Sequence, residues 1–521
     1  MQIEVIIEKK SHKLDAEEGK TILETLQEHG IHVLTAPCGG RGRCGKCTVE
    51  VEHMGEVLAC MTKVTDGMRI TIPKVQLRAQ KSKIAENGTV THYPADDGEG
   101  LDAACDIGTT TVVCHLIDGK TGEKLATVSE PSAQRSFGAD VLSRIQAAEA
   151  GKLEILKEQI IFQIAQMLRT LQKKTGRGEQ IQRLAVVGNT VMCHLFAGIS
   201  PVSIGVTPFM PQEFFGKEYT GEQLGLTDCR SVYIAPAVAG FVGGDITSDL
   251  LAVMQKKPKE KVLLLDIGTN GELALGCRDY LIAGAGAAGP ALEGAVSAFG
   301  MLAQPGAVDR VRIDSDNRIH IHTIGGLPPK GICGSGIVDL IAEGFLSGWI
   351  NGNGTLNLSA APEIRTVHDF DQEKDVPAIF FAPEMYFTET DIAEFIRCKA
   401  AAHTMVATLL EVSGATIQEI GKMYLSGGFG AHYDLESAIT IGLYPDIPRE
   451  RFCILGNSSL GGAIKTLLDR DCIRRVNEIC ARTTYVQFGE MDRFVENMVA
   501  AQFIPHTDAS LYPSVKRRIQ H

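Results

Sequence analysis

The hexapeptide Asp106-Ile107-Gly108-Thr109-Thr110-Thr111 recurs later in the chain, in related form, as Asp266-Ile267-Gly268-Thr269-Asn270-Gly271. Each copy lies within a run of mainly apolar residues, 101–113 and 262–275, which is typical of a buried strand. A motif that recurs in the same local setting indicates an internal duplication. The repeat therefore predicts that two related halves make up most of the chain.

The segments that follow each copy also correspond. Long helical patterns occur at residues 139–174, with a break near Gly151, and at residues 391–412. A second apolar strand comes after each of them, at residues 184–189 and 423–430, and ends in a glycine turn. This alternation of strands and helices predicts an α/β fold whose two halves face one another across a cleft.

The repeated hexapeptide has the chemistry of a phosphate-binding hairpin. Its glycine lets the backbone approach an anion, its threonines supply hydroxyl and N–H donors, and its aspartate can hold Mg2+ or a Mg2+-bound water. A strand-ending turn without a ligand is the alternative, but two copies in matching halves favour the phosphate site. No GxxxxGK[ST] motif occurs, so a P-loop ATPase is not supported. Residues 284–289 fit G-x-G-x-x-G by letter but lack a clear βαβ context, so we expect no dinucleotide site there.

Four cysteines near the N-terminus, Cys38, Cys44, Cys47 and Cys60, have the spacing C-x5-C-x2-C-x12-C. Four glycines among the first three leave room for several thiolates to converge on one inorganic centre, with backbone N–H groups directed at its sulfurs. The loop is one residue longer than the plant-type [2Fe–2S] pattern, as in vertebrate-type ferredoxins. Structural zinc usually takes two C-x2-C pairs, and only one is present; inert thiols are the other alternative. The spacing predicts a [2Fe–2S] cluster.

The chain divides by composition into four parts. Residues 1–78 form a small β-rich unit, and residues 79–100 change from basic to acidic and cannot form a packed core, so we expect a linker there. The two α/β halves then occupy residues 101–255 and residues 256–521, the second with a C-terminal extension. The elements expected in the first unit are strands at 2–8, 47–52 and 68–72, a polar turn at 9–12 and a short helix at 21–29 that Gly30 ends.

Composition excludes several classes of protein. Of 521 residues, 44% are apolar and 22% are charged, the balance of a folded globular protein. A net charge of −12 argues against nucleic acid as the main partner, and no run of about 18 apolar residues offers a membrane-spanning helix. The first thirteen residues lack the pattern of a signal peptide. Fourteen cysteines without an export signal indicate the reducing cytoplasm, where thiols fill cores or bind metals.

The duplicated halves resemble the actin, Hsp70 and sugar-kinase superfamily of ATPases, in which phosphate loops from two lobes hold the nucleotide and a glycine-rich turn holds the adenosine. The resemblance implies that acidic residues position Mg2+ or the attacking water, namely Asp106, Asp245 and Asp266; for Asp245 a helix N-cap is the alternative. It implies that ATP is bound by Gly108, Thr109, Thr110, Asn189, Gly243, Gly244, Gly268, Thr269, Asn270, Gly334, Ser335, Gly427 and Gly428.

A β-grasp ferredoxin-like domain joined to such an ATPase resembles the reductive activators of corrinoid enzymes. The likeness extends over nearly the whole chain and includes the cysteine loop and residues 187–196, 240–245, 287–294, 331–336, 425–430 and 503–506. It implies ATP-dependent transfer of an electron from the cluster to a Co(II) corrinoid protein of a methyltransferase system, which restores Co(I). A low-potential electron donor is implied as well, and a homodimer stays open. Longer members carry an extra domain where this chain has about 22 residues, which puts any docking role of that domain in doubt.

The implied electron transfer is uphill, since plant-type clusters lie near −400 mV and the Co(II)/Co(I) couple of this family lies lower. A nucleotide state with a different affinity for the partner can shift cobalt toward a more reducible coordination. Three alternatives stay open: an activator of another low-potential enzyme such as a 2-hydroxyacyl-CoA dehydratase, a small-molecule kinase with an attached ferredoxin, and a redox-sensing binding module.

Three further polar residues are expected to be structural. His194 lies in an apolar helical run, which favours a core histidine over a cobalt ligand. Glu389 and Asp391 precede the second long helix, where acidic side chains stabilise the N-terminus.

Overall fold

The computed structural model describes residues 1–73 and 100–519, apart from 8–9, 32, 35, 37–39, 41, 43–44, 255–257, 269, 288, 295–296, 370–372 and 428–432. The predicted linker, 79–100, lies outside these residues except for Gly100. The described chain forms two compact units. Unit 1 contains residues 1–73, 100–245 and 463–473, and unit 2 contains residues 246–462 and 474–519.

The N-terminal part of unit 1 is a five-stranded sheet with the order β2-β1-β5-β3-β4 and one helix packed into its core. β1 pairs in parallel with β5, and the other pairs are antiparallel. Its elements are β1 (Gln2–Ile7), β2 (Lys10–Asp15), α1 (Ile22–Glu28), β3 (Thr48–Val51), β4 (Gly55–Leu58) and β5 (Arg69–Thr71). The polar turn expected at 9–12 is wrong, because Lys10 already pairs with Ile7 across the hairpin. A polar sequence is tolerated there because β2 is an exposed edge strand.

The helix α1 begins and ends where the sequence predicts. Thr21 caps its first turn: the Thr21 hydroxyl accepts from the Glu24 N–H at 3.2 Å, and the Glu24 carboxylate accepts from the Thr21 N–H at 2.8 Å. Gly30 follows with a left-handed φ of 69°. The buried face of the helix, which includes Ile22 and Leu26, packs into the core of this domain.

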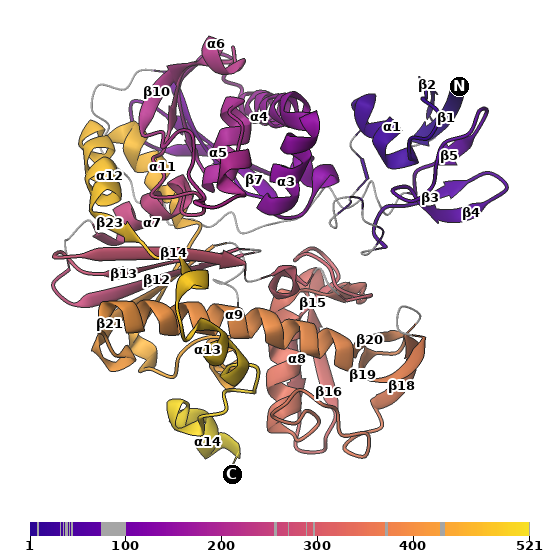
Figure 1. The fold of residues 1–521 in the computed structure, drawn as a ribbon, viewed down its shortest axis with the longest axis vertical. Coiled ribbons are helices and arrows are strands. Elements are labelled where there is room, and N and C mark those ends of the chain that lie inside the picture. Colours follow the sequence, from indigo (N-terminus) through magenta and orange to yellow (C-terminus); the bar gives the residue numbers. More distant parts are fainter. Residues whose placement is uncertain are drawn as a thin grey trace. The chain divides into compact units, whose positions relative to one another are not determined.

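The second part of unit 1 is a six-stranded sheet with the order β10-β11-β9-β6-β7-β8. Gly151, with φ 84°, breaks the long helical segment as predicted. The helix α4 packs along β7 and β8, beside α5 and α3 (Figure 1). The elements are β6 (Leu101–Ile107), β7 (Thr111–Asp118), β8 (Lys124–Pro131), α3 (Val141–Ala147), α4 (Leu153–Thr175), β9 (Ile181–Val187), α5 (Thr190–Ala197), β10 (Lys217–Thr220), α6 (Gly221–Leu224) and β11 (Cys229–Ile234).

Unit 2 contains a sheet with the order β22-β21-β12-β13-β14-β23. Its members are β12 (Lys261–Ile267), β13 (Asn270–Gly276), β14 (Leu281–Ala287), β21 (Ile420–Ser426), β22 (Phe452–Gly456) and β23 (Thr483–Tyr485). In the first large sheet, β6 pairs antiparallel with β7 and parallel with β9, which comes much later in the sequence. In the second large sheet, β12 pairs in the same way with β13 and β21. Five consecutive strands of each sheet, β11-β9-β6-β7-β8 and β22-β21-β12-β13-β14, thus share one topology, which confirms the predicted duplicated α/β fold.

The long helix α9 (Glu389–Ser413) covers β13 and β14 (Figure 1). Its first turn is closed by a capping box, in which the Asp391 carboxylate accepts from the Thr388 N–H at 2.9 Å, so Asp391 serves the helix N-terminus as expected. Glu389 also lies in this first turn, as expected, and it accepts a hydrogen bond from the N–H of Leu356 at 2.7 Å.

Small elements between β14 and β21 complete unit 2, together with helices from the end of the chain. Two three-stranded sheets were not predicted: β16-β15-β17 and β18-β19-β20. Their strands are β15 (Ala307–Ile313), β16 (Ile319–Thr323), β17 (Gly331–Ile332), β18 (Ile364–Asp369), β19 (Lys374–Ala382) and β20 (Met385–Thr388). The remaining helices of the described chain are α7 (Gly244–Val253), α8 (Gly334–Leu346), α10 (Leu435–Thr440), α11 (Ser458–Leu468), α12 (Arg470–Arg482), α13 (Phe494–Ala500) and α14 (Pro513–Ile519). Among the described helices, none is long and apolar enough to cross a membrane.

Candidate functional site

Two of the four cysteines of the N-terminal motif, Cys47 and Cys60, are described; Cys38 and Cys44 lie outside the described residues. Cys47 precedes β3 and Cys60 follows β4, and these strands form a hairpin, so both thiols lie at the same end of it. The Cys47 carbonyl accepts from the N–H of Ala59 at 3.0 Å, which holds the two chain segments together. Both cysteines are buried.

Glycines bring the loop backbone close to this hairpin end. Gly40 has φ 82°, and a Cβ on it would lie 3.8 Å from the Cβ of Cys60. Gly42 has φ 73°, and a Cβ there would lie 2.8 Å from the sulfur of Met61. The left-handed conformations of both residues favour glycine, and at Gly42 the side chain of Met61 also leaves little room for a Cβ. Within the described residues, no group of three or more metal-binding side chains occurs, and the described part of the loop fits a cluster held by thiolates.

The first phosphate loop of unit 1 is the turn between β6 and β7. Asp106 lies near the end of β6, opposite Val187 of the parallel strand β9. A Cβ on Gly108 would lie only 2.5 Å from the carbonyl oxygen of Thr111, so the tight turn requires glycine. Gly108, Thr109 and Thr110 are half-buried at the carboxyl edge of the sheet. This is the edge at which α/β folds bind their ligands.

The end of β9 brings further predicted residues to the same edge. Asn189 caps α5, since its Oδ1 accepts from the Val191 N–H at 3.0 Å and its Nδ2 donates to the Phe241 carbonyl at 3.3 Å. A Cβ on Gly243 would lie 2.5 Å from both the Gly188 oxygen and the Thr190 nitrogen. The segment that carries Gly243, Gly244 and Asp245 is therefore packed directly on the end of β9. Asp245 lies in the first turn of α7, where a carboxylate also stabilises the helix.

The second phosphate loop, in unit 2, repeats this arrangement. Asp266 of β12 lies opposite Ser426 of the parallel strand β21. A Cβ on Gly427, which has φ 88°, would lie 2.2 Å from the Asp266 Oδ1, so Gly427 and the Asp266 carboxylate are in contact. The Gly268 N–H donates to the Asn270 carbonyl at 2.8 Å and closes the turn. Thr269 and Gly428 lie outside the described residues.

A buried hydroxyl pair extends from the second loop and includes Ser458, which no sequence motif predicted. The Ser426 hydroxyl lies 2.8 Å from that of Ser458, which in turn donates to the Asp249 carboxylate at 2.5 Å. Asp249 lies on α7, four residues after Asp245, and is wholly buried. Its side chain therefore links α7 to the end of β21.

Gly334 and Ser335 begin α8, which follows the short strand β17. The structure places them on this helix N-terminus, an element separate from the two turns that carry the phosphate loops. Cys333 is the cap residue, and its sulfur lies 3.4 Å from the Ser335 hydroxyl. Helix N-termini favour anions, which is consistent with the predicted nucleotide role.

Arg144 was not predicted as a functional residue. It lies on α3 with its side chain fully buried, and its Nη2 donates to the carbonyl of Thr109 in the first phosphate loop. Burial, the main cause, lowers the pKa of its guanidinium to about 9. A lone arginine within the helical pattern 139–174 carries no motif, so only the packing of the folded chain reveals it.

His194, by contrast, is a core histidine, as expected. It is fully buried; its Nδ1 lies 2.8 Å from the Thr190 carbonyl and its Nε2 accepts from the Glu213 N–H at 3.3 Å. Burial lowers its pKa. Its ring also packs edge-on against Phe215.

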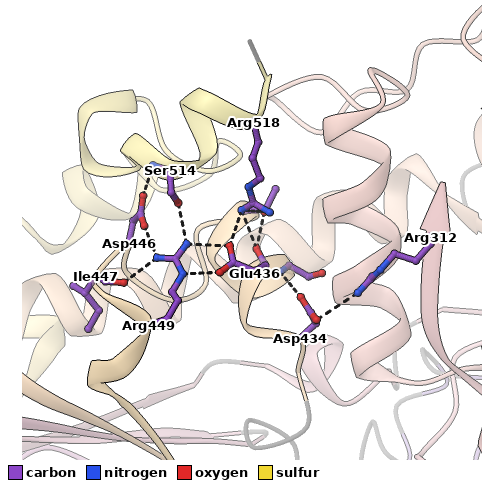
Figure 2. Close-up of polar contacts among 10 residues, drawn as sticks. Arg312, Asp434, Glu436, Asp446, Ile447, Arg449, Ser514 and Arg518 are labelled. Carbon is purple, nitrogen blue, oxygen red and sulfur yellow. Dashed lines mark hydrogen bonds and ion pairs between the residues drawn. The ribbon is translucent and has the colours of Figure 1, made fainter. Parts of the chain in front are cut away.

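An ion-pair network anchors α10, the helix that follows the glycine turn after β21 (Figure 2). Arg449 binds both carboxylate oxygens of Glu436, at 2.6 and 3.0 Å, and Asp446 at 2.7 Å. From the C-terminal helix α14, Ser514 and Arg518 join the same network. The network thus fixes α10 to the end of the chain.

On the β15 side, Arg312 connects α10 to α8. Its guanidinium pairs with Asp434, directly before α10, at 3.4 Å and with the buried Asp339 of α8 at 2.9 Å (Figure 2 shows the Asp434 contact). Burial raises the pKa of Asp339 although Arg312 opposes this shift. α8 and the start of α10 are therefore joined through one arginine.

Comparison with known proteins covers most of the chain. A family model for a 2Fe-2S iron-sulfur cluster binding domain matches residues 4–74, one for the RACo middle region matches 101–257, and one for the C-terminal domain of RACo, the ASKHA domain, matches 260–516. A solved reductive activator for a corrinoid, iron-sulfur protein is 30% identical, covering 98% of this chain and all of its own, with a TM-score of 0.74.

Two curated relatives are also similar. The corrinoid activation enzyme RamQ of Eubacterium limosum is 29% identical over 553 aligned residues, which cover 89% of this chain and 93% of the relative. The [Co(II) methylated amine-specific corrinoid protein] reductase of Methanosarcina barkeri is 27% identical over 425 residues, with 73% and 72% covered.

Proposed function

Since this chain belongs to the RACo family of reductive activators, we propose that it is an ATP-dependent activator that passes one electron from a [2Fe–2S] cluster to a Co(II) corrinoid protein and so restores Co(I). One observation carries the proposal. The cysteine loop and both phosphate loops occur in a single chain, and a solved reductive activator matches that chain almost from end to end. A ferredoxin or a kinase alone accounts for only part of this arrangement.

Cys38, Cys44, Cys47 and Cys60 are the residues that would hold the cluster. When bound, the cluster supplies a one-electron carrier, whose potential in plant-type proteins is about −400 mV. The buried Cys47 and Cys60 provide two thiolates at one hairpin end, and the glycines of the loop keep side-chain bulk away from them. For a one-electron step, each ~59 mV of unfavourable difference lowers the equilibrium constant tenfold. The residues therefore support electron transfer but do not by themselves make it favourable.

Binding and hydrolysis of ATP at the phosphate loops would supply the free energy that the uphill electron transfer requires. We assign the nucleotide phosphates and Mg2+ to the loop at Asp106 in unit 1 and to the loop at Asp266 in unit 2, with Asp245 as a candidate for orienting the attacking water. Both aspartates end a central strand beside a glycine turn, an arrangement that suits Mg2+ and phosphate. A nucleotide state that changes the affinity for the corrinoid partner can favour the reducible form of cobalt, and hydrolysis then resets the complex.

The acceptor we propose is a corrinoid protein of a methyltransferase system, and the donor is a low-potential electron carrier. The names of the similar proteins support the first assignment, because both curated relatives and the solved activator are named for corrinoid proteins. Which methyl-group substrate is served depends on the separate methyltransferases.

The test is spectroscopic. The reconstituted protein is mixed anaerobically with a Co(II) corrinoid protein and a reductant, and Co(I) formation is followed by its absorbance with ATP, without ATP and with a non-hydrolysable analogue. We expect Co(I) to accumulate with ATP and to stay low without nucleotide. Equal Co(I) formation with and without ATP would remove the ATPase from the mechanism, and phosphoryl transfer to a small molecule faster than basal hydrolysis would favour a kinase instead.

A further inference from the structure

Arg144 places a buried guanidinium directly behind the first phosphate loop. Its Nη2 donates to the carbonyl of Thr109, and its Nε donates to the carbonyl of Gly138 at 3.3 Å. Its Nη1 donates to the Gln134 side-chain oxygen at 3.4 Å and approaches the Met192 sulfur at 2.9 Å. Each of these acceptors is electrically neutral.

A buried charge that is satisfied only by neutral groups is unusual, because burial of an ion is costly unless an opposite charge compensates it. Among the described residues, no ion pair includes Arg144, and its contacts are the hydrogen bonds named above. Asp140, the acidic group that acts on it, lies on the same helix and already accepts from the N–H and the hydroxyl of Ser143, at 2.8 and 3.0 Å. Arg135 adds a like charge nearby. The guanidinium of Arg144 therefore contributes positive charge directly beside the loop, and this contribution favours an anion there.

The hydrogen bond to Thr109 also orients the loop. In a trans peptide, the carbonyl of one residue and the N–H of the next point in opposite directions. Because Arg144 binds the Thr109 carbonyl from the protein interior, the N–H of Thr110 is directed toward the outer side of the turn. Gly108 meanwhile holds the turn tight against Thr111. Donors on the outer side and a cation on the inner side are both favourable for a phosphate group.

We propose that Arg144 is a positioning residue for the nucleotide: its guanidinium holds the Thr109–Thr110 peptide in its phosphate-binding orientation, and its charge attracts the phosphate groups across the loop. This inference rests on the proposed ATP site. It predicts that the contribution of Arg144 to affinity grows with the charge of the phosphate chain, which a purely structural role would not produce.

The test compares the dissociation constants of AMP, ADP and ATP, with Mg2+, in the cluster-loaded full-length protein by calorimetry. For Arg144→Gln we expect ATP affinity to fall by about 10- to 100-fold and AMP affinity to fall much less. Arg169→Gln is the matched control, because this exposed arginine of α4 pairs with Asp228 away from the loop. An equal loss for all three nucleotides, or no loss, would overturn the inference. Failure of the wild-type protein to bind any nucleotide would instead refute the proposed function.

A second variant keeps Arg144 in place and gives its guanidinium a negatively charged partner. Gln134→Glu puts a carboxylate at the side chain that already accepts from Arg144, at the cost of the hydrogen bond from Gln134 to the Leu156 carbonyl. We expect the new ion pair to preserve folding and to lower ATP affinity relative to AMP affinity at least fivefold. An unchanged ratio of the two affinities would contradict the inference even if Arg144→Gln does not fold.

Discussion

Single buried side chains give the molecule an acid-sensitive core. His115 of β7 is only 2% exposed, and its Nδ1 has no hydrogen-bond partner within the described residues. Burial, with a smaller effect of Lys124, lowers its pKa from 6.5 to about 3. Between these values the unfolded chain binds a proton that the native chain does not, so stability is complete above pH 6.5 and decreases as the pH falls toward 3.

This linkage gives a pH-dependent prediction. Below pH 6.5, His115 should cost the wild-type protein about 1.4 kcal/mol of unfolding free energy for each pH unit, and His115→Leu should remove that part of the slope. Urea unfolding at pH 7, 6 and 5 measures the difference between the two proteins. The control is His12→Gln on the exposed strand β2, which should follow the wild type. Parallel pH profiles for wild type and His115→Leu would contradict the prediction.

At the same scale, residues within motifs could be predicted and isolated residues could not. Asp106 and Asp266 could be predicted because each begins a copy of the repeated motif, two residues before a glycine. The structure places each near the end of a central strand. Arg144 and Asp249 lie in ordinary helical patterns, and their importance arises only from burial beside segments that are distant in the sequence. A pattern within a short window contains no information about such contacts.

At the scale of elements, the network around Arg449 holds α10 and α14 together (Figure 2). Hydrogen bonds from Arg449 are the largest cause that lowers the pKa of Glu436, and at Asp446 the burial that would raise its pKa is outweighed by hydrogen bonds from Arg449 and Ser514 together. Both carboxylates are therefore ionised at neutral pH, and Arg449 is the partner that they share.

Removal of that guanidinium should loosen the end of the chain. We expect Arg449→Met to lower the unfolding free energy by about 2 to 3 kcal/mol, since the nearly buried Asp446 would lose a charged partner. Differential scanning calorimetry would detect the lower Tm. Arg474→Met supplies the comparison: its exposed pair with Glu478 on α12 should contribute less than about 1 kcal/mol. If both variants had the same Tm, the network would contribute no more to the unfolding free energy than the exposed pair does.

Elements with a strong period were predicted well, and short polar ones were not. The helices α1, α4 and α9 have clear starts and an apolar face, and they occur where the sequence predicts. The edge strand β2 is polar, and its first residues have the pattern of a turn. The strands β15 to β20 form two small sheets outside the repeated pattern, and β15, β18 and β19 contain charged residues, so their pairing depends on partners that a local pattern cannot identify.

At the scale of the whole molecule, the chain combines two activities whose residues belong to separate domains. Cys47 and Cys60 lie in a domain with its own apolar core, whereas Asp106 and Asp266 lie in the two larger sheets. A substitution in one domain should therefore leave the other folded and able to bind its ligand. The proposed function requires both, because the uphill electron transfer needs the carrier and the nucleotide together.

Two variants should separate these activities. Cys60→Ser should lose the EPR signal of the reduced cluster and all Co(I) formation, yet bind ATP within about twofold of wild type. Asp266→Asn should keep the EPR signal and reduce ATP-dependent Co(I) formation by about 10- to 100-fold, through weaker Mg2+ and phosphate binding. Cys480→Ser, on α12 and far from the motif in the sequence, should change neither property.

The pattern of losses then discriminates between mechanisms. If Asp266→Asn formed Co(I) at the wild-type rate, the nucleotide loops would have no part in electron transfer, and the redox-sensing alternative would gain support. If Cys60→Ser retained activity, the electron would reach cobalt without the cluster, and the cysteine loop would be structural. The expected result is that Cys60→Ser loses the EPR signal but still binds ATP, that Asp266→Asn keeps the EPR signal, and that both variants lose Co(I) formation. Only this result requires that a nucleotide-driven change and an iron–sulfur carrier act on the same corrinoid partner.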